Sequence, residues 1–355
     1  MPLRRVVKCG KFIAHPLRHC ILRAMVLAGI DEAGYGPVLG PLVVGCCAFE
    51  LGGANGGTDD DALAPVPCLW KTLRKSCSKK RSKTGRKLHV NDSKIVYSPA
   101  GGLKELERSV LALACCAWAD WDGSQRDFFG RIAPNIPTDI SQYAWYGDDA
   151  LESQFPFEQE SIAIKLLANV MRIEMNATNV TCAHLCARVV MERELNHMIE
   201  QTRNKGSALF SISAYHIDQL LRRFGDRGLV LFCDRQGGRE HYGSLLRQMF
   251  DDWSLEIIDE QPSRAEYRLH KNGHVVRIIF CEKAETQCMA VAYASMISKY
   301  LRESFMRRFN AFWRNHLPDV APTAGYHTDG MRFLNDIDHK RRELGIADAE
   351  LVRCR

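Results

Sequence analysis

The sequence predicts an α/β fold, in which strands and helices alternate along the chain. Short apolar runs of strand length recur, and segments with helical periodicity separate several of them. Acidic residues and glycine-rich turns stand where some of the apolar runs end. The 355 residues suffice for one large domain with additions, and a composition of 46% hydrophobic and 25% charged residues is ordinary for a globular protein.

The individual elements follow from these patterns. Strands are expected where short apolar runs are bounded by turn residues, at 26–30, within 38–49, at 229–233 and at 275–280. Helices are expected where apolar residues recur at helical spacing, at 103–118, 161–176, 182–202 and 285–309. Residues 51–87 and 119–160 break the alternation, the first through Gly, Asp, Lys and Arg and the second through Trp, Pro, Asp and Gly. Both are therefore expected to be insertions.

The first insertion ends in a segment dense in lysine and arginine, residues 71–87. A run of like charges is usually a solvated, mobile loop. The alternative is a loop that lies against a phosphate backbone, and both interpretations stay open. The net charge of +6, from 48 Lys and Arg against 42 Asp and Glu, permits a nucleic-acid partner without requiring one.

Residues 1–24 form a basic N-terminal extension with no acidic residue and without the long apolar core of a secretory signal. The extension is either a basic presequence of mitochondrial type or a segment that precedes the functional start at Met25. The second interpretation is favoured, because Met25 stands directly before a strand pattern. A basic arm that touches nucleic acid is a weaker third interpretation. No apolar run reaches the roughly 18 residues of a membrane helix, so a membrane span is not expected.

The 14 cysteines include no C-x-x-C pair, and the adjacent cysteines at 46–47 and 115–116 suit buried apolar positions better than disulfides. Cys182, His184 and Cys186 are spaced by two residues on the helix expected there. A zinc site would need further ligands, and the sequence offers no matching Cys or His pair. Free thiols persist in a reducing compartment, so a cytoplasmic location is expected.

Four carboxylates stand at the ends of expected strands or at the start of a helix. Asp31 and Glu32 follow the first strand, Asp234 ends another, and Glu285 opens the last long helix. Each alone is as readily a turn or helix cap. Together, at one edge of an open sheet, they would repel one another unless divalent cations neutralised them. Two-metal phosphodiester hydrolysis uses such a cluster, so the sequence predicts a site for Mg²⁺ or Mn²⁺.

The local sequence around these carboxylates resembles the type 2 ribonuclease H family, which comprises ribonucleases HII and HIII. The similar stretches keep the family's order and are residues 31–41 (DEAGYGPVLGP), 88–94 (LHVNDSK), 283–299 (KAETQCMAVAYASMISK) and 325–328 (GYHT). They correspond to the opening signature, the Asp-Ser-Lys loop, the last acidic position with its small-residue helix, and the Gly-Tyr-x-Thr stretch. They bracket residues 26 to about 340.

The resemblance implies a ribonuclease H-like mixed β-sheet flanked by helices, with large insertions and a helical C-terminal part. The catalytic domain would span 25–355, with insertions near 51–87 and 119–160. The implied activity is a metal-dependent endoribonuclease that hydrolyses the RNA strand of RNA–DNA hybrids, or ribonucleotides embedded in duplex DNA. The products would carry 5′-phosphate and 3′-hydroxyl ends. The enzyme is expected to be a monomer whose partner is the hybrid nucleic acid.

The resemblance also implies roles for individual residues. The catalytic, metal-binding carboxylates would be Asp31, Glu32, Asp234 and Glu285. Contacts with the substrate are implied for Gly34, Tyr35, Gly36, Ser93, Lys94 and Tyr326. Ser93 and Lys94 would bind phosphates, and the backbone of the glycine-rich turn would sense the ribose 2′-hydroxyl.

The chain departs from the family in its turn and in its size. Tyr35 replaces a cationic residue and is expected either to stack on a sugar or to pack down. Glu285 is the ribonuclease HIII choice where ribonuclease HII usually has Asp, yet the amino-terminal binding domain of ribonuclease HIII is not found. Two alternatives therefore stay open. The chain could be a nuclease of this fold that acts on structured RNA or a DNA junction, or a non-catalytic nucleic-acid-binding relative.

Overall fold

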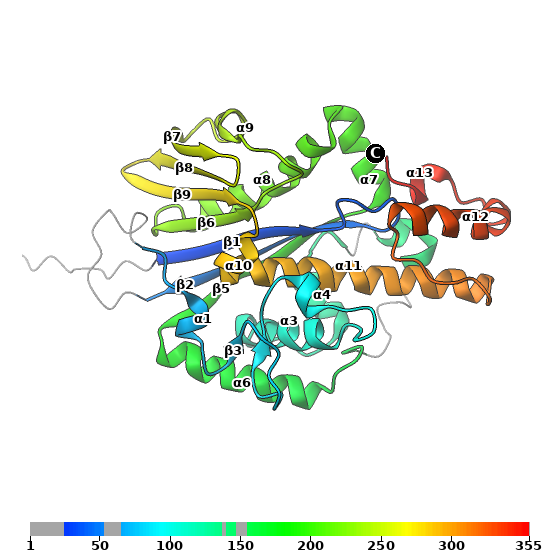
Figure 1. Ribbon diagram of the computed structural model, residues 1–355, viewed down its shortest axis with the longest axis horizontal. Coiled ribbons are helices and arrows are strands. Elements are labelled where there is room, and N and C mark those ends of the chain that lie inside the picture. The colour runs from blue at the N-terminus through cyan, green and yellow to red at the C-terminus, as the bar shows by residue number, and fades with distance from the viewer. Residues whose placement is uncertain (1–24, 53–64, 137–139, 147–154, 355) are drawn as a thin grey trace, which may run out of the picture.

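The centre of the computed structural model is one large β-sheet (Figure 1), and the structure describes residues 25–52, 65–136, 140–146 and 155–354. Its strands are β1 Met25–Ala33, β2 Leu42–Leu51, β5 Val180–Val190, β6 Leu229–Asp234, β7 Ser254–Gln261, β8 Arg264–Lys271 and β9 His274–Cys281. They lie in the order β5-β2-β1-β6-β9-β8-β7. β6 runs parallel to both β1 and β9, whereas the other neighbours are antiparallel. The predicted mixed sheet is confirmed.

Helices cover both faces of this sheet (Figure 1). One face carries α7 Glu192–Thr202, α8 Lys205–Phe224 and α9 Gly243–Met249. The other carries α3 Lys104–Ala117, α4 Gln125–Ile132, α6 Ser161–Ala177 and α11 Met289–His316. Shorter elements are α1 Leu69–Thr72, α2 Ser93–Val96, α10 Ala284–Gln287, α13 Asp348–Leu351 and the strand pair β3 Cys77–Ser78 and β4 Leu88–His89. The expected helical C-terminal part consists of α11, α12 His327–Glu343 and α13.

Each face of the sheet has its own apolar core, because side chains alternate along a strand. Val26, Ala28 and Ile30 of β1 join the core under α8, whereas Leu27 joins the core under α11. Gly29 faces α11, and a Cβ at this position would lie 2.2 Å from the backbone nitrogen of Val291. Glycine therefore lets the backbone of α11 approach β1 directly beside the first predicted carboxylate.

The helix expected over 182–202 is wrong in its first half. β5 pairs with β2 along its whole length, and α7 begins only at Glu192. No glycine or proline separates the two elements, and the Cys, Ala, His and Leu residues in the middle of β5 suit a helix as well as a strand. Pairing with β2 decides the outcome, because it hydrogen-bonds the backbone of β5. The last long helix is likewise divided at Cys288, whose backbone is extended, into α10 and α11.

The two insertions contribute to the core. In the basic segment, Leu73 and Cys77 are buried, and the Glu174 carboxylate of α6 accepts hydrogen bonds from Lys75 N and Ser76 N at 2.8 and 2.7 Å. Because of these anchors the segment is not a freely solvated loop. In the second insertion, α4 buries Phe128 and the following turn buries residues 145–146. The described part of 119–160 therefore contains a helix and adds side chains to the core.

The predicted N-terminal extension, residues 1–24, lies outside the described residues, as do 53–64, 137–139 and 147–154 of the insertions. Within the described part of the chain, no helix is both long and apolar enough to cross a membrane.

Candidate active site

The sheet brings three of the predicted carboxylates to one edge. β1 continues through Asp31 and Glu32 to Ala33, so the two acidic residues lie within the strand and not after it. β1 and β6 are parallel, with Ile30 in register with Cys233, which places Asp31 beside Asp234. The carboxyl ends of parallel strands are the usual position of a site in an open α/β sheet.

The fourth carboxylate reaches the same place through α10. The backbone nitrogen of Ala284 donates a hydrogen bond to Asp234 Oδ1 at 3.1 Å. Glu285 follows directly and is buried in the first turn of α10. The structure thus brings together all four carboxylates that the sequence singled out, from β1, β6 and α10.

The four groups share one electrostatic environment. Burial raises the pKa of each, well above its ordinary value for Asp31, to about 8 for Glu32 and to about 7 for Glu285. The negative charge of Asp234 raises the pKa of the other three further, whereas Lys94 lowers the pKa of Glu32 and Glu285. The site therefore resists carrying its full negative charge unless cations enter it.

The Asp-Ser-Lys loop adds a fifth carboxylate. Asp92 caps α2 by accepting a hydrogen bond from Lys94 N at 2.9 Å, and its charge raises the pKa of Asp234 and Glu285. Asp92 belongs to one of the sequence motifs, yet no role was expected for it. The sequence feature that could have indicated a role for Asp92 is its place two residues before Lys94 in the same motif.

A serine pair supports Asp31 from α11. Ser295 hydrogen-bonds the Asp31 carboxylate and thereby lowers its pKa, and the Ser295 and Ser93 hydroxyls lie 3.0 Å apart. Ser298 Oγ also donates to the backbone oxygen of Asp31 at 3.0 Å. Ser93 is buried, whereas Lys94 is exposed. Of the two predicted phosphate contacts, the structure leaves Lys94 open to a ligand and places Ser93 in the support of Asp31.

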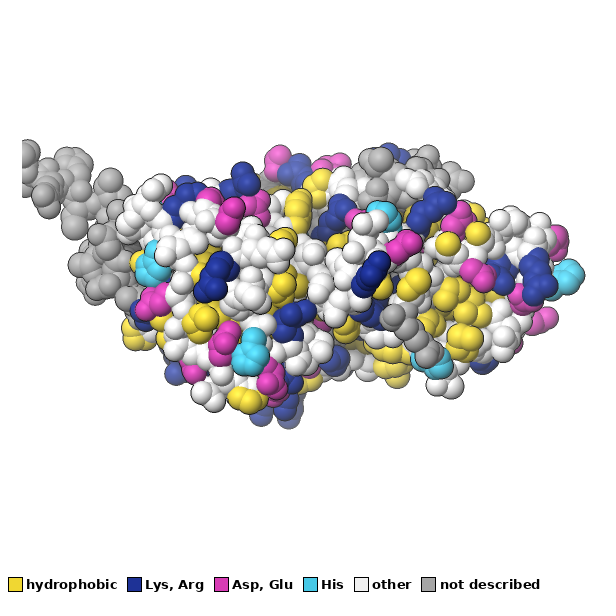
Figure 2. Space-filling model, turned by 90° about the horizontal axis from the view of Figure 1, so that it is seen from above, with side chains coloured by type: hydrophobic (Ala, Val, Ile, Leu, Met, Phe, Trp, Pro, Cys, Tyr) yellow, Lys and Arg dark blue, Asp and Glu magenta, His cyan; other side chains and the backbone are white. Residues whose placement is uncertain are grey.

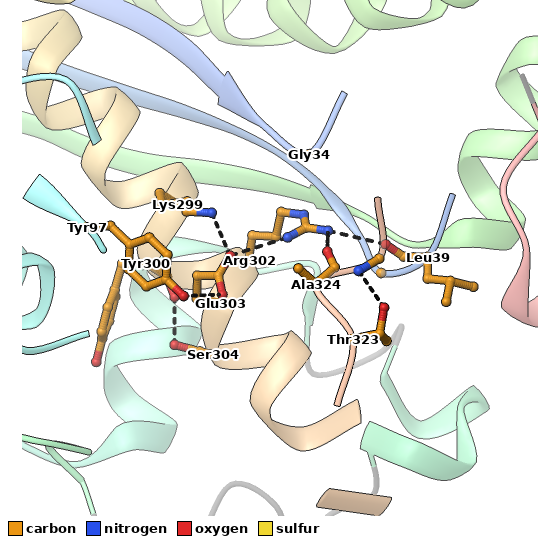
Figure 3. Close-up of polar contacts among 12 residues, drawn as sticks. Gly34, Leu39, Tyr97, Lys299, Tyr300, Arg302, Glu303, Ser304, Thr323 and Ala324 are labelled. Carbon is orange, nitrogen blue, oxygen red and sulfur yellow. Dashed lines mark hydrogen bonds and ion pairs between the residues drawn. The ribbon is translucent and has the colours of Figure 1, made fainter. Parts of the chain in front are cut away.

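The glycine-rich turn is fixed by a buried arginine of α11. Gly34 has a φ of +91°, and a Cβ there would lie 2.6 Å from Arg302 Nε. Arg302 Nη2 donates to the backbone oxygens of Leu39 and Ala324 at 3.3 and 2.9 Å (Figure 3). The geometry of the turn thus depends on a glycine at 34 and on Arg302, which lies outside the sequence motifs.

Tyr35 packs down against the core under α8. Its ring lies beside Gly237, and the Lys205 ammonium is 5.1 Å from the ring centroid. The adjacent Gly36 is exposed, and a Cβ on it would meet no atom within 4 Å. Of the two expectations for Tyr35, packing is the one the geometry favours, and Gly36 presents its backbone to solvent.

Tyr326 lies on the far side of the same turn. The backbone oxygen of Gly325 accepts hydrogen bonds from Val38 N and Leu39 N at 2.8 and 3.2 Å, which joins the two segments. The Tyr326 ring is half exposed, and the guanidinium carbon of Arg302 lies 5.8 Å from its centroid. Gly325 is therefore joined to residues 38–39, and the Tyr326 side chain beside it remains accessible.

The basic segment reaches the site at one point. Lys79 Nζ donates to the backbone oxygen of Thr286 at 2.6 Å, directly after Glu285. On the face drawn in Figure 2, by contrast, lysine and arginine side chains are interspersed with acidic ones. Positive charge near the carboxylates thus comes from Lys94, with Lys79 of the basic segment close by at Thr286.

The donor set of the site is made of oxygen atoms, which suits Mg²⁺ and Mn²⁺. The carboxylates are not drawn into a tight cluster. Among the described residues, the one group of at least three His, Cys, Asp or Glu whose ligand atoms all lie within 4.8 Å is Cys46, His184 and Cys186. The carboxylates thus offer the oxygen ligands that these ions prefer, but no three of the described ones lie within 4.8 Å of one another.

Fold and site together define an α/β protein with an acidic site at the ends of two parallel strands. The sequence matches no protein-family model and no curated protein. The structure is similar, across nearly the whole chain, to type 2 ribonucleases H. With the ribonuclease HII of Archaeoglobus fulgidus, solved as a complex with PCNA, it shares 15% identity at a TM-score of 0.39, over 93% of this chain and 95% of that one.

Two further solved structures show the same similarity. The ribonuclease H2 of Pyrococcus horikoshii is 13% identical at a TM-score of 0.35, and 92% of each chain is covered. Bst-RNase HIII in complex with Mn²⁺ is 13% identical at a TM-score of 0.38, over 96% of this chain and 70% of that one.

Proposed function

We propose that the protein is an endoribonuclease that hydrolyses the RNA strand of RNA–DNA hybrids, or ribonucleotides embedded in duplex DNA, with Mg²⁺ or Mn²⁺. The observation that carries this proposal is the convergence of Asp31, Glu32, Asp234 and Glu285, whose shared burial and repulsion raise the pKa of each. A protein that only binds nucleic acid gains nothing from holding these charges together against their repulsion. A divalent-metal site gains the ligands it needs.

The residues of the chain would divide the work as follows. Asp31, Glu32, Asp234 and Glu285 would hold the ions, which when bound activate the attacking water and stabilise the leaving 3′-oxygen. Ser295 and Ser298 of α11 keep Asp31 in place.

Binding of the substrate falls to other residues. Lys94 is exposed beside the carboxylates, so it would bind a substrate phosphate as a point charge. The exposed backbone at Gly36 lets a ribose approach, which supports recognition of the 2′-hydroxyl through backbone groups. Tyr326, whose side chain is half exposed, would contact the sugar or base.

Cleavage assays test the proposal most directly. The full chain would be assayed with Mg²⁺ and with Mn²⁺ on a matched RNA–DNA hybrid, on a duplex with one ribonucleotide, and on all-DNA and all-RNA controls. We expect cuts only in the first two substrates, with 5′-phosphate and 3′-hydroxyl ends, and no cleavage in excess EDTA. Full activity in EDTA would contradict the metal mechanism, whereas cleavage of structured RNA or a DNA junction alone would favour the alternative substrate.

We further propose that residues 25–355 act as one catalytic domain and as a monomer. The two cores share the single sheet, which supports one folding unit for the described residues. Light scattering coupled to size exclusion, with and without a hybrid duplex, measures the number of chains in the complex.

A further inference from the structure

A second group of metal-binding side chains lies on the face of the sheet covered by α8. Cys46 of β2 stands opposite Cys186 of the edge strand β5 in the antiparallel register. His184 is two residues before Cys186 on the same strand, and residues two apart on a strand point to the same face. His216 comes from α8 and is completely buried. We refer to these four side chains as the Cys–His cluster.

Three of the four side chains approach one another closely, and the fourth, His216, lies against Cys186. The ligand atoms of Cys46, His184 and Cys186 all lie within 4.8 Å of one another. Cys186 Sγ is 3.1 Å from His184 Nε2 and 3.4 Å from His216 Nδ1. Sulfur and nitrogen ligands on a tetrahedral zinc ion, at about 2.3 and 2.0 Å from the metal, lie roughly 3.5 Å apart. Cys186 is therefore spaced from both histidines as in a zinc site, and His216, which lies outside the group of three, has to shift toward the ion to complete it.

His216 already presents the correct nitrogen. Its Nε2 lies 3.0 Å from the backbone oxygen of Val44, which can only accept a hydrogen bond, so Nε2 carries the proton. Neutral His216 consequently directs the lone pair of Nδ1 toward Cys186 Sγ. A backbone carbonyl that fixes the ring in this way is the usual support of a metal-bound histidine.

In His184 the ring proton lies on the nitrogen that faces Cys186. Arg223 Nη1 lies 3.3 Å from His184 Nδ1, and a guanidinium group only donates hydrogen bonds. The proton of neutral His184 therefore sits on Nε2, which faces Cys186. A metal ion at Nε2 would require the proton to move to Nδ1 and Arg223 to turn away. Arg223 is exposed on α8, so nothing buried has to rearrange.

An ion can reach the cluster from solvent. His184 and Cys186 line a surface pocket of about 340 Å³, together with Tyr215, Gln219 and Arg223. β5 is the outermost strand on its side of the sheet, so the pocket opens at an edge. The site is separate from the carboxylates in chemistry as well, because thiolate and imidazole prefer zinc, whereas carboxylate oxygens prefer Mg²⁺ or Mn²⁺.

We propose that the Cys–His cluster binds one Zn²⁺ ion through Cys46, His184, Cys186 and His216. All four positions around the ion are filled by side chains of the protein, which is the pattern of a structural site and not of a catalytic one. The ion joins the edge strand β5 and helix α8 to β2. Because Cys46 lies opposite Ile30 in β1, this bracing acts one residue from Asp31.

Cobalt titration of the reduced, tag-free full chain tests the proposal. Co²⁺ replaces Zn²⁺ in such sites, and its bonds to thiolates absorb in the near ultraviolet, a signal that carboxylate-bound Co²⁺ lacks. We expect this band to saturate at one ion per chain, to disappear when Zn²⁺ is added, and to be accompanied by a higher unfolding temperature with Zn²⁺. A wild-type chain that gives no thiolate band overturns the proposal without any variant.

Three variants sharpen the result. Cys186→Ser should abolish the band, whereas Cys47→Ser should keep it, because Cys47 is equally buried but belongs to the core on the other face of the sheet. Arg223→Gln should tighten binding several-fold, because it removes the group that competes for His184. A thiolate band that survives Cys186→Ser overturns the proposal. So does a chain in which Cys46 and Cys186 form a disulfide and still bind no metal after that disulfide is reduced.

Discussion

Arg353 donates a hydrogen bond from Nη1 to the backbone oxygen of Gly34 at 2.5 Å, across 319 positions of the chain. The same guanidinium group also donates to the backbone oxygens of Gly40 and Tyr35, each at 3.3 Å. Arg353 is buried, and Arg302 holds the turn from its other side. The turn that would present the substrate's ribose to the carboxylates is thus clamped by two buried arginines that are distant in sequence.

The first prediction concerns this clamp. Arg353→Met keeps most of the apolar length of the side chain but leaves buried carbonyl groups without a donor, each at a cost of about 1–3 kcal/mol. We expect the free energy of unfolding to fall by roughly 2–4 kcal/mol in denaturant titrations. Arg193→Met is the control, because Arg193 is exposed and its ion pair with Glu350 is long, at 3.7 Å. A loss there above about 0.5 kcal/mol would show that the effect is not specific to the clamp.

The second prediction separates metal ligands from structural carboxylates. Asp234→Asn and Glu285→Gln preserve shape and remove one charge each. We expect hydrolysis of the hybrid to fall by several orders of magnitude while hybrid binding is kept or improves, because repulsion of the phosphates decreases. Stability without metal should be unchanged or higher, because burial already opposes the charged form. Asp251→Asn, at an exposed position outside the site, is the control. If activity fell only in proportion to the folded fraction, Asp234 and Glu285 would have a structural role and would not be metal ligands.

The third prediction concerns the basic segment. A deletion is unsuitable, since Leu73 and Cys77 are part of the core. Lys79, which reaches Thr286, and Lys83 are both exposed, so Lys79→Gln with Lys83→Gln removes charge from this segment without opening the core. We expect weaker hybrid binding and a shallower dependence of log affinity on log salt, by about 0.7–0.9 for each phosphate that the variant no longer neutralises. The matched pair Arg314→Gln with Arg342→Gln, elsewhere on the surface, should leave the slope unchanged. Equal slopes for both pairs would mean that the segment does not bind phosphates.

The fourth prediction is a pH dependence. Burial raises the pKa of Glu192 from 4.5 to about 7, although Arg353 and Arg302 lower it in part. The folded protein therefore keeps a proton that the unfolded chain releases. The stability contributed by that proton is complete below about pH 4.5 and is lost as the pH rises through about 7.

Glu192→Gln cannot titrate and should flatten the fall in stability between these values. The shift corresponds to at most about 3 kcal/mol. The measurement is the difference in unfolding free energy between Glu192→Gln and wild type across this range, so that contributions from the active-site carboxylates cancel. A difference that does not change with pH would show that folding does not shift the pKa of Glu192.

The acidic edge of the sheet was predictable from sequence because its residues stand in short local patterns. A buried strand ends in Asp234, a glycine-rich turn follows Asp31, and a small-residue helix follows Glu285. Each of these patterns can be read from residues that are neighbours in the sequence, without knowledge of the fold.

What the sequence did not reveal depends on contacts between distant segments. β5 shows no strand signal of its own, because its strand state comes from β2. Arg302 and Arg353 look like ordinary surface cations until the fold buries them against backbone oxygens. Of Cys182, His184 and Cys186, only His184 and Cys186 share a group, and on a strand instead of a helix, whereas Cys182 packs on the other face of the sheet. Their partners Cys46 and His216 come from other elements.

The parallel pairing of β1 with β6 also has a consequence for the order of folding. Val26 pairs with Leu229, so the strand made first must wait for more than half the chain before it has both of its neighbours. Contacts of such long sequence separation make folding slow. During synthesis the carboxylates of β1 thus leave the ribosome long before Asp234, Glu285 and Arg353. A nascent chain carries the signature of the site but has no assembled site until its final segments have docked.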